Sequence, residues 1–120
     1  MAQSAGFHED SDLLSDETKD RHRAIVSLQE ELEAVDWYDQ RVEAATDDAL
    51  KAILAHNRDE EKEHAAMVLE WLRRRDPVID DNLRTYLFTS EPILEIEETE
   101  EGGGGGDGSL GIGSLRGVAQ

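Results

Sequence analysis

Apolar side chains recur every three to four residues along two long stretches, about residues 15–45 and 48–75, as they do on one face of an α-helix. Acidic residues open the second stretch and three arginines close it, which suits the helix dipole, and Asp76-Pro77 predicts its end. A shorter segment from Asp80 to Phe88 predicts a third helix. Nothing in the sequence predicts a strand.

Two long helices joined by a short turn at Thr46 to Asp48 predict an antiparallel hairpin. The predicted fold class is all-α: a two-helix antiparallel hairpin plus a short C-terminal helix. The folding part comprises only roughly 75 residues, which is little for a stable monomer. We therefore expect two copies to dimerise into a four-helix bundle that covers the apolar face of each hairpin.

The composition divides the chain into four segments. Residues 1–14 are predicted to be a disordered N-terminus, residues 15–90 the helical hairpin domain, and residues 91–108 a flexible linker rich in glutamate and glycine. Residues 109–120 carry apolar side chains among glycines. An apolar peptide on a tether is typical of a docking segment, and a frayed terminus without function is the alternative.

Charge and cysteine content narrow the function classes. The net charge of −17 disfavours nucleic acid as a partner and favours cations. With no cysteine, any metal must bind to oxygen and imidazole ligands. The sequence has no apolar run long enough for a membrane span and no signal-peptide pattern at its start, so we expect a cytoplasmic protein.

The second predicted helix places Glu61 and His64 inside its apolar stripe. Burying a carboxylate beside an imidazole costs several kcal/mol unless a partner compensates, and a metal ion is such a partner. The first helix places Glu31 at the margin of its own apolar face. Asp39 also falls within that stripe, so its position alone makes it either a rival ligand or an ion-pair partner.

One hairpin would thus supply half of a metal site. A two-fold dimer doubles Glu31, Glu61 and His64 to four carboxylates and two imidazoles, the ligand set of di-iron carboxylate bundles. Such ligands suit iron or manganese, and zinc is not excluded. The alternative is a structural helical dimer in which Glu61 and His64 only pair with each other across the interface.

Two blocks of sequence resemble the encapsulated ferritins. They are "DRHRAIVSLQEELEAVDWYDQR" at Asp20 to Arg41 and "AILAHNRDEEKEHAAMVLEWLRR" at Ala52 to Arg74, followed by "LRTYLFT" and the carboxy-terminal "LGIGSL". The resemblance covers about residues 15–90 together with the terminal peptide. It implies a ferritin-like four-helix bundle, formed by two chains, and the closure of such dimers into an annular decamer.

The resemblance also implies a function. It implies a ferroxidase that oxidises Fe²⁺ to Fe³⁺ at a di-iron site between two subunits, with Glu31, Glu61 and His64 as metal ligands and Tyr38 beside them. Residues 109–120 would dock on an encapsulin shell, and iron would be mineralised and stored in the lumen of that nanocompartment. A non-enzymatic iron-binding cargo or chaperone of the compartment is the alternative.

Glu30, Glu33 and Trp37 share a face of the first helix that is turned away from the apolar stripe. The pattern alone indicates a solvated acidic face, whereas the resemblance implies a site where metal ions enter. Of the remaining candidates, the histidines at 8 and 56 are expected to be solvated, His22 has no assigned role, and Trp71 is expected in the core or an interface.

Overall fold

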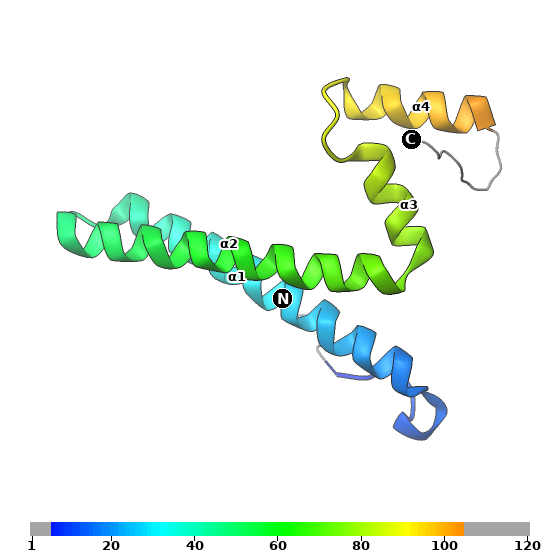
Figure 1. The fold of residues 1–120 in the computed structure, drawn as a ribbon. Coiled ribbons are helices and arrows are strands. Elements are labelled where there is room, and N and C mark those ends of the chain that lie inside the picture. The colour runs from blue at the N-terminus through cyan, green and yellow to red at the C-terminus, as the bar shows by residue number, and fades with distance from the viewer. Residues whose placement is uncertain (1–5, 105–120) are drawn as a thin grey trace. The chain divides into compact units, whose positions relative to one another are not determined.

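The structure is a computed structural model that describes residues 6–104. These residues form one 3-10 turn and four α-helices and contain no strand (Figure 1): η1 at Ser11–Leu13, α1 at Asp16–Ala44, α2 at Asp48–Arg75, α3 at Pro77–Tyr86 and α4 at Ile93–Gly104. The all-α prediction is confirmed. The chain falls into two compact units, divided between Leu72 and Arg73, which are described separately below.

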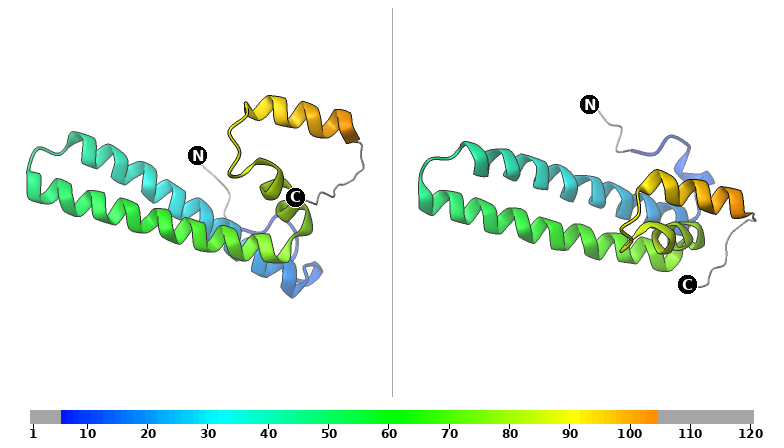
Figure 2. Two further views of the ribbon diagram at one scale, coloured as in Figure 1. Left: turned by 45° about the horizontal axis from the view of Figure 1, so that its top comes forward. Right: turned by 90° about the horizontal axis from the view of Figure 1, so that it is seen from above.

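The first unit is built on the predicted hairpin. Helices α1 and α2 run side by side in opposite directions in every view (Figures 1 and 2). Ser15 caps α1 by accepting a hydrogen bond from the backbone N–H of Thr18 at 3.1 Å. At the turn, the Asp47 carboxylate accepts the backbone N–H of Leu50 at 2.9 Å, so the connection ends in a helix cap. No helix in residues 6–104 has the length and apolarity needed to cross a bilayer.

The hairpin alone buries very few side chains. Among the described residues, Ala65 and Leu72 are the buried apolar side chains. Residues of the predicted apolar stripes are instead about half exposed: Ile25 44%, Leu32 55% and Ile53 57%. Since water contact with large apolar side chains is unfavourable, an apolar face of this length needs a partner surface.

Residues 6–15, before α1, have a defined backbone conformation, whereas the sequence predicts disorder for residues 1–14. They include the 3-10 turn η1, and the ring of Phe7 lies 4.8 Å from the ring of His22 on α1. Residues 1–5 lie outside the described range. An aromatic residue in this otherwise polar segment provides an apolar contact with α1 that periodicity analysis does not detect.

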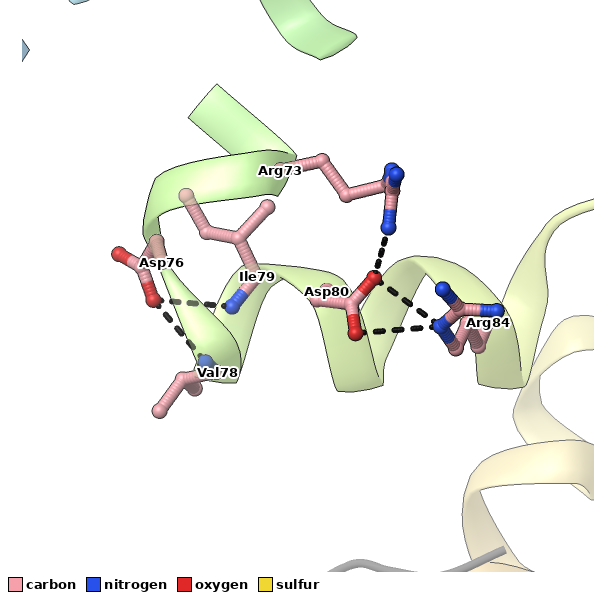
Figure 3. Close-up of polar contacts among 6 residues, drawn as sticks. All are labelled: Arg73, Asp76, Val78, Ile79, Asp80 and Arg84. Atoms are coloured by element: carbon pink, nitrogen blue, oxygen red, sulfur yellow. Dashed lines mark hydrogen bonds and ion pairs between the residues drawn. The ribbon is translucent and has the colours of Figure 1, made fainter. Parts of the chain in front are cut away.

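In the second unit, α3 begins at Pro77 and ends at Tyr86, whereas the sequence predicts Asp80 to Phe88 (Figure 3). The predicted boundaries are wrong because Asp76-Pro77 does two things at once. It ends α2, and it also starts α3: the Asp76 carboxylate accepts the backbone N–H groups of Val78 and Ile79 at 3.0 and 3.1 Å. At the other end, the extended backbone of Leu87 ends the helix, and Phe88 follows with φ of 63°, in the left-handed region, so neither residue continues α3.

The α2–α3 corner is held by one carboxylate between two arginines (Figure 3). Asp80 accepts hydrogen bonds from Arg73 in the last turn of α2 and from Arg84 Nε, the latter at 3.0 and 3.1 Å. Burial of Asp80 raises its pKa, but the hydrogen bonds from Arg84 and Arg73 outweigh that effect and lower the pKa of Asp80 below its ordinary value.

Helix α4 occupies most of the segment that the sequence predicts to be a flexible linker, residues 91–108. Its first turn is closed by hydrogen bonds from the backbone N–H groups of Glu95 and Ile96 to the carbonyl of Pro92, and it contacts α3. Glutamate is a good helix former, which the emphasis on charge and glycine overlooked. Residues 105–120, with the predicted docking peptide, lie outside the described residues.

Candidate metal centre

The structure brings Glu31 of α1 together with Glu61 and His64 of α2. His64 Nδ1 lies 3.3 Å from Glu61 Oε1 and 3.6 Å from Glu31 Oε1. One possible ligand atom from each of the three residues lies within 4.8 Å of the other two. The three residues, here called the triad, thus converge from two helices on a space the size of one metal ion.

Local helix geometry explains half of this arrangement. Glu61 and His64 are three residues apart on α2, so their side chains are neighbours on one face. Glu31 reaches them only because α1 lies antiparallel to α2 in the matching register. In the single chain the side chains are not fully buried: both glutamates are 26% exposed and His64 is 45% exposed. The burial that the sequence predicts for Glu61 and His64 is therefore only partial in the single chain.

The triad behaves electrostatically as a set of ligands without their cation. A hydrogen bond with Glu61, together with desolvation, raises the pKa of Glu31. The same hydrogen bond lowers the pKa of Glu61, so Glu31 keeps its proton to a higher pH than Glu61 does. The hydrogen bond to Glu61 also raises the pKa of His64. A cation that binds these three side chains would compete with protons on Glu31 and His64.

Asp39 does not join the triad. Its carboxylate pairs with the guanidinium of Arg58 on α2, at 3.0 Å from Arg58 Nη1. Of the two sequence interpretations, rival ligand and ion-pair partner, the structure shows the ion pair. The sequence analysis did not single out Arg58. Two features of the sequence could have indicated this ion pair. Arg58 is a basic residue one helical turn before Glu61, and Asp39 is an acidic residue within the apolar stripe of the other helix.

The other predicted site residues lie apart from the triad. Tyr38 follows Glu31 by two helical turns, or about 10 Å along α1, and the guanidinium of Arg41 stacks on its ring at 5.3 Å. Glu30 and Glu33 are exposed on α1, and Trp37 is 49% exposed. None of these four residues belongs to the triad.

The histidines outside the triad have other surroundings. His8 is exposed, in line with the sequence prediction. His56 is 70% exposed and lies 3.8 Å from Glu60 one turn along α2. His22 contacts the ring of Phe7. None of these three belongs to a group of three or more possible ligands within residues 6–104.

The donor set fits a particular class of metal. Two carboxylates and one imidazole are hard or borderline ligands and suit iron, manganese or zinc. Three donors leave positions open on an ion that prefers four to six ligands. The triad is therefore a partial coordination sphere, chemically suited to a divalent cation but incomplete within one chain.

Comparison with known proteins decides the family. The family model described as EncFtn-like matches residues 6–90. The chain is 63% identical to an encapsulated ferritin-like protein of Rhodospirillum rubrum, over 99% of this chain and 94% of that relative. The chain belongs to the EncFtn-like family, the encapsulated ferritins. The resemblance recognised in the sequence is confirmed.

Three further proteins are similar to this chain. A ferritin-like protein of Thermotoga maritima is 55% identical, over 91% of this chain and 96% of its own length. An encapsulin nanocompartment cargo protein of Myxococcus xanthus is 34% identical over 64% of this chain and 59% of its own. A crystal structure of a Nitrosomonas europaea protein is 68% identical, with a TM-score of 0.71, covering 73% of this chain and 97% of that one.

Proposed function

We propose that this EncFtn-like chain is a ferroxidase that oxidises Fe²⁺ at a di-iron site formed between two subunits. The observation that supports it most is the triad: two carboxylates and an imidazole from separate helices converge within 4.8 Å, at the margin of an uncovered apolar face. The substrate is Fe²⁺. The product is Fe³⁺, a harder ion that carboxylate oxygens stabilise more strongly.

A second copy of the chain would complete the site. Two triads related by a two-fold axis supply four carboxylates and two imidazoles for two iron ions, as in the di-iron carboxylate bundles. The same pairing would cover Leu32 and Ile53, which are 55% and 57% exposed in one chain. Site completion and burial of the apolar stripe would thus come from the same contact, and the family resemblance implies that such dimers close into an annular decamer.

The redox balance is simple. Two Fe²⁺ ions each lose one electron, and the two electrons with two protons convert one O₂ molecule to hydrogen peroxide, or reduce a peroxide to water. Glu31 and Glu61 would hold the ions together, and neutral His64 would fix one coordination direction. A proton on Glu31, whose pKa is raised, would leave when a cation binds.

Residues around the triad have proposed roles in delivery. Glu30, Glu33 and Trp37, on the outward face of α1, would attract Fe²⁺ before it reaches the triad, aided by the net charge of −17. Tyr38, two helical turns after Glu31 on the same face of α1, would lie beside the di-iron centre. Both roles rest on the family resemblance and on the placement of these residues along α1.

The oxidised iron is proposed to be stored in an encapsulin nanocompartment of the cytoplasm. The names of two relatives support this location, one as an encapsulated ferritin-like protein and one as an encapsulin nanocompartment cargo protein. Residues 109–120 would dock on the inner wall of the shell. Iron would then mineralise in the shell lumen, because a ring of two-helix chains encloses little space of its own.

Anaerobic addition of Fe²⁺ followed by air tests the activity. We expect wild-type protein to form Fe³⁺ much faster than buffer does, and the Glu31→Ala, Glu61→Ala and His64→Ala variants to lose that rate. Glu43→Ala is the matched control, since it removes one exposed carboxylate from α1 outside the triad. Iron binding without acceleration would support the alternative, an iron-binding cargo or chaperone that is not an enzyme.

A further inference from the structure

The triad depends on the alignment of two helices, and the apolar contacts of one hairpin are too few to define that alignment. Glu31 is on α1, whereas Glu61 and His64 are on α2. A slip by one residue moves α1 by about 1.5 Å along its axis. Metal–ligand distances tolerate only about ±0.2 Å. Within residues 6–72, apolar packing is non-directional and buries Ala65 and Leu72 alone.

A directional contact between the helices lies about two helical turns along α1 from Glu31. Arg58 Nη1 donates to Asp39 Oδ1 at 3.0 Å, and Arg58 Nε donates to Asp59 Oδ1 at 3.2 Å. The guanidinium is therefore held by one carboxylate from each helix. Its side chain is only 23% exposed, which indicates that the stem lies against the hairpin.

The register of this ion pair is the register of the triad. Asp39 lies eight residues after Glu31 on α1, and Arg58 lies three residues before Glu61 on α2. Because the helices are antiparallel, a later residue on α1 faces an earlier residue on α2. The ion pair and the triad are therefore compatible with the same alignment of the two helices. On α1 the two contacts are about 12 Å apart, and on α2 Arg58 is about 4.5 Å from Glu61 and about 9 Å from His64, so a rigid shift of one helix along the other moves both contacts together.

We infer that Arg58 and Asp39 are positioning residues, whose ion pair sets the place of Glu31 relative to Glu61 and His64 and thereby the metal affinity of the triad. The inference rests on the proposed function, because it presumes that the triad binds metal. Neither residue is a ligand. An exposed ion pair contributes little to the free energy of unfolding. The effect that we infer is on the positions of the three ligand side chains.

Co²⁺ titration of the full chain tests this role, because the visible absorption of bound Co²⁺ reports coordination geometry as well as affinity. We expect Arg58→Gln and Asp39→Asn each to weaken Co²⁺ binding about 3- to 10-fold and to alter the spectrum. The double variant with the two charges exchanged, Arg58→Asp with Asp39→Arg, restores both. Arg23→Gln is the control, since it removes a guanidinium whose partner Asp20 is on the same helix, at 2.6 Å.

The sign of the effect separates positioning from simple charge. Removing the positive Arg58 strengthens the attraction of a cation through the field alone, whereas removing the negative Asp39 weakens it. Positioning weakens binding in both variants. Tighter binding by Arg58→Gln, or unchanged affinity and spectrum in both single variants, would overturn the inference.

Two further measurements keep the result decisive. Far-UV circular dichroism checks that each variant keeps its helices, and Asp39→Asn, nearly identical in shape to the wild-type side chain, decides the matter if Arg58→Gln fails to fold. If the Glu31→Ala variant binds Co²⁺ as tightly as the wild type, the proposed metal site itself has failed. If only the Arg58 and Asp39 variants match the wild type, the site stands and the positioning role is refuted.

Discussion

Protons and metal ions compete for the triad, so its metal affinity is predicted to rise with pH. A hydrogen bond to Glu61 raises the pKa of His64 above its ordinary value of 6.5. Below that raised pKa the imidazole is protonated in the metal-free chain, and a cation must displace the proton. Affinity should therefore keep rising through pH 6.5 and level off only above the raised pKa.

The magnitude follows from the number of protons displaced. One proton on His64 costs about tenfold in affinity for each pH unit below its pKa. The pKa of Glu31 is also raised, from its ordinary 4.5, by its hydrogen bond with Glu61. The slope should steepen toward acid as this second proton comes into play, approaching about a hundredfold for each pH unit.

Co²⁺ titrations between pH 5 and 8 at constant ionic strength measure this dependence without oxidation of the metal. Calorimetry in two buffers of different ionisation enthalpy counts the protons released. The His64→Gln variant should bind more weakly and lose most of the slope above pH 6. An affinity that is flat over this range, or that levels off below pH 6.5, would refute the competition that we derive from the triad.

Three further outcomes are expected. Asp76→Ala should destabilise the chain by about 1 kcal/mol, because two backbone N–H groups of α3 lose their cap; an unchanged melting temperature in thermal circular dichroism contradicts this. Ile53→Glu should shift the protein toward monomers in light scattering, whereas Ala52→Glu, one position off the apolar stripe, should not; an unaltered mass for both would mean that the stripe is not the interface. Deletion of residues 109–120 should abolish co-purification with an encapsulin shell and leave Fe²⁺ oxidation intact; retained co-purification would place docking elsewhere.

The sequence allowed the hairpin to be predicted closely, because helix periodicity, caps and breakers are local signals. The predicted α2, residues 48–75, has the bounds found in the structure. The convergence of Glu31 with Glu61 and His64 could also be anticipated, since each lies on or beside the apolar stripe. That convergence is a matter of geometry, and metal binding by these residues is still a prediction.

The remaining errors have identifiable causes. The start of α3 was misplaced because one Asp-Pro pair both ends α2 and caps α3. The charge of the glutamate run and the glycines after it predict a flexible linker, whereas the helix propensity of glutamate favours α4. The position of Asp39 on its helix face does not distinguish a metal ligand from a partner of Arg58. That choice depends on the register between the two helices.

The central claim, a ferroxidase site completed by two chains, is tested most directly by stopped-flow oxidation of Fe²⁺ with the mass of the protein measured in parallel. We predict a rapid phase that ends at about one Fe²⁺ oxidised per chain, or two for each pair. It should occur only in samples whose mass shows paired chains, and it should vanish in the Glu61→Ala variant. A rapid phase of the same size in monomers, or oxidation no faster than in buffer, would contradict the account.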